Sequence, residues 1–151
     1  MNQVLKAKKI KNIMKNTRSS RPALFKTTQN RKSVELLEDY VEAIYETINL
    51  KGVVKNVDLC KFFGVSNATV SKNIQRLIKA KLVKSEKYKS IFLTDAGKKL
   101  AQKSNARHEI LYKFLIKLGI SKKTAETDSE GMEHHISNET LNMMKKNIQS
   151  N

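Results

Sequence analysis

The sequence contains one cysteine, one proline, no tryptophan and five glycines among its 151 residues. A single thiol cannot form an internal disulfide, so the chain is not a small disulfide-stapled domain, and we expect a reducing, cytoplasmic compartment. Cys60 stands in the apolar run 59–63, which favours a small buried hydrophobe over a reactive thiol. The scarcity of proline and glycine predicts a mainly α-helical protein with few turns.

Long hydrophobic runs are also missing. No stretch approaches the roughly 18 apolar residues of a membrane span, and no secretory hydrophobic region stands near the start. We therefore expect no membrane partner. The sequence has no Gly-rich phosphate loop and no nucleophile motif, so we expect neither an enzyme nor a small-molecule substrate.

Acidic residues are absent from the first part of the chain. Residues 1–32 contain ten Lys or Arg and no Asp or Glu, whereas residues 33–151 contain twenty basic and fourteen acidic residues. This excess attracts polyanions, and charge alone does not choose between nucleic acid and an anionic membrane surface. We interpret residues 1–32 as a basic, disordered arm. This arm could contact phosphates, or it could be a solvated tail without function. Its basic, acid-free composition also resembles that of an organellar transit peptide.

Apolar residues at helical spacing predict a first helix over 34–51. A second helix fits residues 56–63, where Gly64 stops it. Ser66 can then cap a third helix that ends near Ala80. Two helices joined by a short turn with glycine form a helix-turn-helix.

Two β-prone runs, 82–84 and 90–93, predict a hairpin after the third helix. Helix-turn-helix and hairpin together are the winged helix-turn-helix plan, which we assign to residues 33–98 as a DNA-binding domain. Between residues 66 and 90 there are seven basic residues and one acidic residue, more one-sided than a merely solvated surface. We expect small polar residues of the third helix at base edges and basic residues of the helix and wing at phosphates: Ser66, Asn67, Thr69, Ser71, Lys72, Asn73, Arg76, Lys84, Lys87 and Lys89.

Three further helices complete the chain. Thr94 caps one that reaches about Leu118, Ser121 caps the next, and Ser137 starts the last. We assign residues 99–151 to an all-helical second domain.

Two carboxylates and an imidazole stand close together near the C-terminus. In a helix, Glu130, Glu133 and His134 would lie at i, i+3 and i+4 and project from one face. Such a set is half of a metal site, and its oxygen ligands suit hard divalent ions such as Mn²⁺. Asp39 and Glu42 form an i, i+3 pair on the first helix. Taken alone, each group fits a solvated helix surface better than a metal site.

Four separated segments together resemble one family. They are Leu-Leu-Glu-Asp-Tyr-Val-Glu at 36–42, the winged helix, Arg-His-Glu at 107–109 and Glu-Gly-Met-Glu-His-His at 130–135. In order and spacing they are similar to the manganese-responsive branch of the diphtheria toxin repressor (DtxR) family of metal-dependent transcriptional regulators. The resemblance covers roughly residues 34–144.

The resemblance implies a metal-binding and dimerisation domain with two Mn²⁺ ions per subunit. It also implies their six ligands: Asp39, Glu42, His108, Glu130, Glu133 and His134. Iron-dependent relatives carry Met at the position of Asp39 and Cys at the position of Glu130. Carboxylates at both positions replace soft donors with hard ones, which favours Mn²⁺ over Fe²⁺.

The function that the resemblance implies is a Mn²⁺-activated repressor of manganese uptake genes. It would act as a homodimer on a palindromic operator in double-stranded DNA. Metal would tie the first helix to the C-terminal helices and so fix where the recognition helices point. An iron-responsive DtxR-type repressor and a metal-independent winged-helix protein remain alternatives. The dimer interface is expected to use apolar residues of the C-terminal helices: Ile110, Leu111, Phe114, Leu115, Leu118, Ile120 and Leu141.

Overall fold

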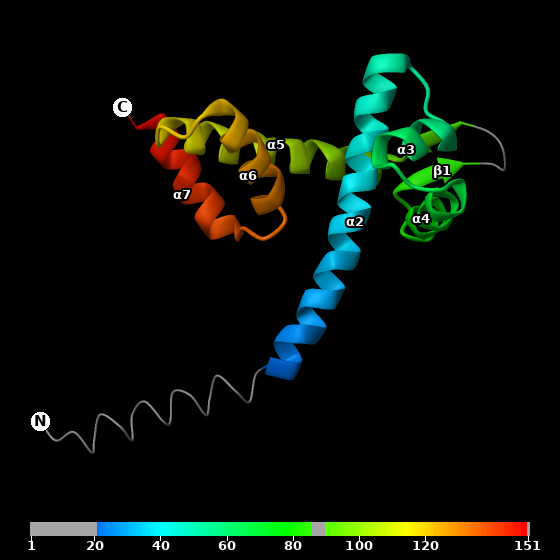
Figure 1. The fold of residues 1–151 in the computed structure, drawn as a ribbon, viewed down its shortest axis with the longest axis horizontal. Coiled ribbons are helices and arrows are strands. Elements are labelled where there is room, and N and C mark those ends of the chain that lie inside the picture. The colour runs from blue at the N-terminus through cyan, green and yellow to red at the C-terminus, as the bar shows by residue number, and fades with distance from the viewer. Residues whose placement is uncertain (1–20, 86–89, 151) are drawn as a thin grey trace, which may run out of the picture. The chain divides into compact units, whose positions relative to one another are not determined.

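The computed structural model describes residues 21–85 and 90–150, with side chains from residue 32 onward. The chain divides into two compact units, Met1–Leu36 and Leu37–Asn151. The described ranges hold six helices and one two-stranded sheet (Figure 1), in the order α2 (Arg21–Lys51), α3 (Asn56–Phe63), α4 (Asn67–Lys79), β1 (Val83–Ser85), β2 (Ile91–Leu93), α5 (Asp95–Lys117), α6 (Lys122–Met132) and α7 (Asn138–Gln149). The predicted fold class, mainly helical with a winged helix-turn-helix, is confirmed.

The first unit, as far as it is described, is the beginning of α2. Disorder was predicted for residues 1–32, and residues 1–20 lie outside the described residues. For residues 21–32 the prediction is wrong, because α2 begins at Arg21. Extending an existing helix costs much less than nucleating one. Pro22 lies in the first turn, where its missing N–H removes no helical hydrogen bond.

The second unit begins within α2, whose apolar stripe packs on the helix-turn-helix. Tyr40, Val41 and Ile44 are buried, and the ring of Tyr40 stacks on Phe63 of α3 with centroids 4.3 Å apart. The turn between α3 and α4 depends on Gly64, whose φ of 64° lies in the left-handed region that glycine adopts without a Cβ clash.

The wing is an antiparallel pair in which Val83 faces Leu93 and Ser85 faces Ile91. Val83, Ile91 and Leu93 are buried while Phe92 is exposed, so the side chains alternate as expected of a sheet with one buried face. Val54, in the loop after α2, adds a bridge to Ile91. The hairpin tip, residues 86–89, lies outside the described residues.

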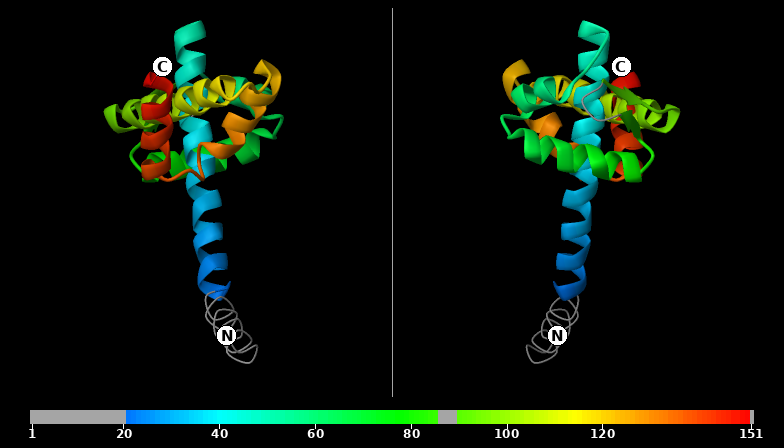
Figure 2. Two further views of the ribbon diagram at one scale, coloured as in Figure 1. Left: turned by 90° about the vertical axis from the view of Figure 1, so that its left-hand side faces the viewer. Right: turned by 90° about the vertical axis from the view of Figure 1, so that its right-hand side faces the viewer.

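The C-terminal helices form a small bundle in which α5 packs against both α6 and α7, as the left view of Figure 2 shows. Leu111 and Leu115 of α5, Ala125 of α6 and Leu141 of α7 are its buried apolar residues. The predicted caps are present: hydroxyl oxygens of Thr94, Ser121 and Ser137 each accept a hydrogen bond from a backbone N–H in the first turn. Within residues 21–85 and 90–150, every helix is too short or too polar to cross a membrane.

Candidate metal centre and nucleic-acid interface

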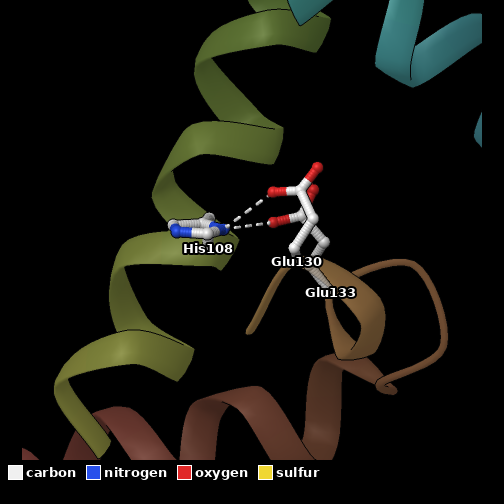
Figure 3. A group of neighbouring side chains, drawn as sticks. All are labelled: His108, Glu130 and Glu133. Carbon is white, nitrogen blue, oxygen red and sulfur yellow. Dashed lines mark hydrogen bonds and ion pairs between the residues drawn. The ribbon is translucent and has the colours of Figure 1, made fainter. Parts of the chain in front are cut away.

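Three potential ligands converge where α6 ends against the middle of α5 (Figure 3). One ligand atom from each of His108, Glu130 and Glu133 lies within 4.8 Å of the other two. His108 Nδ1 is 3.0 Å from Glu133 Oε2 and 3.6 Å from Glu130 Oε2. Glu130 is largely exposed, whereas Glu133 is only 1% exposed.

Glu133 is the buried centre of this cluster. Burial raises the pKa of its carboxyl group, and the nearby Glu130 carboxylate raises it further, while His134 and His108 lower it. A carboxylate removed from water in this way is stable only beside positive charge or a cation.

His134 joins the cluster to α2. Its Nε2 lies 3.2 Å from Asp39 Oδ1 and 3.5 Å from Glu133 Oε1, and its Nδ1 lies 2.9 Å from Glu38 Oε2. Hydrogen bonds to Asp39 and Glu38 raise the pKa of His134 to about 10, against an opposing effect of burial. At neutral pH the ring is therefore the positively charged imidazolium, and it lies among the carboxyl groups of Glu38, Asp39 and Glu133.

The helix that was expected to carry all three C-terminal ligands ends earlier. α6 stops at Met132, and Glu133 keeps helical backbone angles as its C-cap. His134 lies in the following turn, where the N–H of His135 bonds to the Met132 carbonyl. The expectation that His134 lies on the same helix as Glu130 is therefore wrong. The reason is that Ser137 must begin α7 with extended backbone, which leaves room for only a short turn.

Glu42 lies on α2, one turn beyond Glu38. Its Oε1 is buried without a hydrogen-bond partner. Burial raises the pKa of Glu42 to about 7; the Ser104 hydroxyl lowers it, and the Glu133 carboxylate raises it again. Buried polar atoms in folded proteins almost always have a partner. An orphaned, buried carboxylate oxygen near other carboxylates fits a bound divalent cation. Glu133, His134 and Glu130 all act electrostatically on the Glu42 carboxyl group, which places Glu42 in the same neighbourhood as the other predicted ligands.

Sequence reasoning missed two residues of this cluster. Glu38 was not predicted because it belongs to a generally acidic helix face. Its position beside Asp39 and four residues before Glu42 was the signal that could have found it. Glu126 lies one turn before Glu130, and its Oε1 is 3.6 Å from His108 Nε2. The i, i+4 spacing of Glu126 to Glu130 was a usable signal.

The start of α4 presents the predicted base-contacting residues. Ser66 caps the helix by accepting a hydrogen bond from the Thr69 N–H. Asn67 and Thr69 are exposed, as is Lys72 one turn on. Asn56, at the start of α3, donates through Nδ2 to Asn67 Oδ1 at 3.1 Å and to Ser71 Oγ at 2.9 Å. This amide fixes α4 to α3 at the end that would meet DNA.

The remaining predicted DNA contacts differ in accessibility. Lys84 is exposed on β1, and Arg76 is half-buried. Asn73 is only 6% exposed and accepts a hydrogen bond from Arg76 Nη1, so it faces the interior. This corrects the prediction for Asn73, because a buried amide cannot reach a base edge. Lys87 and Lys89 lie outside the described residues.

The residues predicted for a dimer interface also separate by exposure. Leu111, Leu115 and Leu141 pack inside the bundle of their own subunit. Leu118 and Ile120 are exposed, as is Met143, which had not been predicted. Ile110 and Phe114 are half-buried, and Phe114 borders a groove of about 490 Å³ with Met143 and Met144.

Comparison with known proteins gives two family matches. Residues 32–91 match the iron dependent repressor N-terminal DNA binding domain. Residues 94–150 match the iron dependent repressor metal binding and dimerisation domain.

Individual relatives agree with these matches. The transcriptional regulator MntR of Escherichia coli O6:H1 is 41% identical over 121 residues, which cover 80% of this chain and 78% of that protein. MntR of Salmonella typhimurium is 42% identical over 117 residues, covering 78% and 74%. A manganese-dependent transcriptional repressor solved in complex with manganese has a TM-score of 0.67 at 26% identity, covering 75% of this chain and 52% of its own. The chain thus spans about half the length of that solved repressor.

Proposed function

Because this chain belongs to the iron dependent repressor family, we propose that it is a manganese-responsive transcriptional repressor that binds DNA. Its N-terminal domain is a DNA-binding domain and its C-terminal domain binds metal and dimerises. We place the boundary between them at residues 98 and 99, after a basic arm of residues 1–32. Relatives named as transcriptional regulators support the expectation that the chain is not an enzyme.

The proposed metal centre uses six side chains and holds two Mn²⁺ ions: Asp39, Glu42, His108, Glu130, Glu133 and His134. The observation that carries this proposal is the buried, unpartnered Glu42 Oε1 beside the buried Glu133 carboxylate. Bound divalent cations would supply the positive charge that lets four carboxylates ionise together at short distance. Oxygen donors at Asp39 and Glu130 favour Mn²⁺ over softer ions.

The proposed switch follows from where the ligands come from. Asp39 and Glu42 belong to α2, which packs on the helix-turn-helix through Tyr40, whereas Glu133 and His134 follow α6. In the metal-free protein, the protonated His134 holds α2 to this turn through Glu38 and Asp39. When His134 and Glu42 give up their protons, their lone pairs become available as ligands. The switch is an equilibrium between the metal-free and the metal-bound arrangement of α2 and this turn. Moving that equilibrium from 1:99 to 99:1 takes roughly 5.5 kcal/mol of differential binding.

DNA recognition is proposed for a homodimer on a palindromic operator. The recognition helices α4 of two subunits would meet half-sites about 34–36 Å apart. The exposed apolar residues Leu118, Ile120 and Met143 are the part of the C-terminal bundle available to a second copy. The buried Leu111, Leu115 and Leu141 instead hold each subunit together.

The test is a fluorescence anisotropy titration with a promoter fragment from a manganese uptake gene of the host. We expect tight binding with Mn²⁺ and weak binding with EDTA. Glu133→Gln should bind weakly in both, while Glu109→Gln, an exposed neighbour of His108 on α5, should behave as wild type. Equal DNA affinity in Mn²⁺ and EDTA would overturn the proposal. Full activation by Fe²⁺ at concentrations where Mn²⁺ is inactive would favour the iron-responsive alternative.

A further inference from the structure

The guanidinium group of Arg107 closes the turn between α6 and α7. Its Nε and Nη2 donate to the Glu133 carbonyl at 3.0 and 2.6 Å. Nη2 also donates to the Ile136 carbonyl at 2.5 Å, and Nη1 donates to Asn138 Oδ1 at 3.1 Å. One half-buried side chain of α5 thus holds both ends of the segment 133–138.

The carbonyl groups at the end of a helix have no partner within the helix and need donors from elsewhere. Arg107 supplies them at the residue where α6 ends, since Glu133 is the C-cap. The planar fork of arginine can serve several acceptors in fixed directions, whereas the ammonium group of lysine acts as a point charge with three rotatable donors. The contact is therefore specific to a guanidinium in this position.

The clamped segment carries two potential ligands. Glu133 and His134 are consecutive residues, and their side chains point toward His108 and Asp39. Arg107 directly precedes His108 on α5, so a single turn of α5 offers one ligand and fixes the backbone that presents two more. Alignment of these groups depends on the backbone of the turn, because α6 has already ended.

We propose that Arg107 is a positioning residue of the metal centre: its guanidinium holds the Glu133 and Ile136 carbonyls so that the Glu133 and His134 side chains converge with His108. This inference rests on the proposed metal-binding function. Loss of Arg107 frees the turn, while the apolar contacts of Ala125 and Leu141 keep the bundle folded. Removing an outer partner that orients metal ligands lowers metal affinity by about 10–100-fold.

The experiment measures Mn²⁺ affinity by electron paramagnetic resonance of the free ion, using the full chain. The variants are Arg107→Lys and Arg107→Gln, with Lys113→Gln as a control that also removes one positive charge from α5. We expect both Arg107 variants to bind Mn²⁺ about 10–100-fold more weakly and the Lys113 variant to stay within about twofold. Wild-type affinity in Arg107→Lys would overturn the proposal, because it would show that charge suffices.

Two further measurements separate positioning from simple stabilisation. Urea unfolding of the metal-free variants reports stability, and hydrogen exchange reports opening of the amides of residues 134–138. Positioning predicts that Arg107→Lys adds little to the affinity already lost in Glu133→Gln, because both act through one ligand set. A full, additive loss in the double variant, or a drop in stability at unchanged Mn²⁺ affinity, contradicts positioning. Failure of the wild-type chain to bind Mn²⁺ at all would instead refute the proposed function.

Discussion

Glu38 and His134 are 96 positions apart in the sequence, and Glu38 Oε2 lies 2.9 Å from His134 Nδ1. This contact directs Nδ1 toward a carboxylate and leaves Nε2 facing Asp39 and Glu133. A histidine whose second nitrogen is held by a carboxylate has a fixed ring orientation and presents the other nitrogen to a metal. The geometry therefore identifies Nε2 as the ligand atom of His134 in the proposed centre.

Metal affinity should increase with pH. The pKa of His134 is about 10 and that of Glu42 about 7, both raised, so both groups hold protons that a metal must displace. Between pH 7 and 8.5, Mn²⁺ binding must displace mainly the His134 proton, because Glu42 is already ionised. One displaced proton predicts roughly tenfold tighter Mn²⁺ binding per pH unit. Below pH 7 the Glu42 proton adds to this dependence. Calorimetry in buffers of different ionisation enthalpy counts the protons, and a pH-independent affinity would contradict the assignment.

Glu42→Gln should stabilise the metal-free protein at high pH. A carboxyl group whose folded pKa is raised from 4.5 to about 7 contributes full stability below pH 4.5 and loses it as pH rises through 7. At pH 8 the substitution should raise the free energy of unfolding by about 1–2 kcal/mol, a value reduced for partial solvent exposure. At pH 4.5 it should have little effect. Urea denaturation followed by circular dichroism measures both, with the exposed Glu46→Gln as control.

Gly97→Ala should destabilise the fold. Gly97 is buried in the first turn of α5, and an added Cβ would lie 2.1 Å from the Leu82 carbonyl oxygen. Because a backbone atom cannot yield cheaply, we expect a loss of about 2–3 kcal/mol. Gly131→Ala is the matched control, since a Cβ there meets nothing within 4 Å and alanine favours a helix by about 0.5–1 kcal/mol. Similar thermal midpoints for both variants would contradict the close packing.

Deletion of residues 1–20 tests the basic arm. This segment carries six of the thirty Lys and Arg residues, and the cut leaves α2 intact from Arg21. If the arm binds phosphates, the slope of log K against log salt should fall by about 0.9 for each phosphate that the arm neutralises. The readout is anisotropy with Mn²⁺ present at several salt concentrations. An unchanged slope assigns the segment to a tail that does not touch DNA.

Local chemistry explains which parts of this structure could be predicted from the sequence. The caps at Ser66, Thr94, Ser121 and Ser137 depend on residues within one turn, so the helix starts were predicted correctly. The beginning of α2 was not predictable in this way, because its first turns lack an apolar stripe and continue a helix fixed farther along.

The candidate site required information that no local pattern contains. Spacing placed Glu130 and Glu133 on one face, but the pairing of Glu38 with His134 depends on how α2 meets the turn after α6. Likewise, Asn73 looked like a base-reading residue until the rotation of α4 about its axis was known, which turns it inward. The role of Arg107 was hidden because its partners are mainly backbone carbonyls, which any sequence supplies.

Asp39 and Tyr40 are neighbours in the chain, yet one faces the carboxylate cluster and the other stacks on Phe63 of α3. A single peptide bond therefore links a residue of the proposed metal centre to a residue that contacts the helix-turn-helix. Both residues lie on α2, so no flexible linker separates the two contacts. In the proposed switch, the step from the metal centre to the helix-turn-helix therefore runs along one continuous helix.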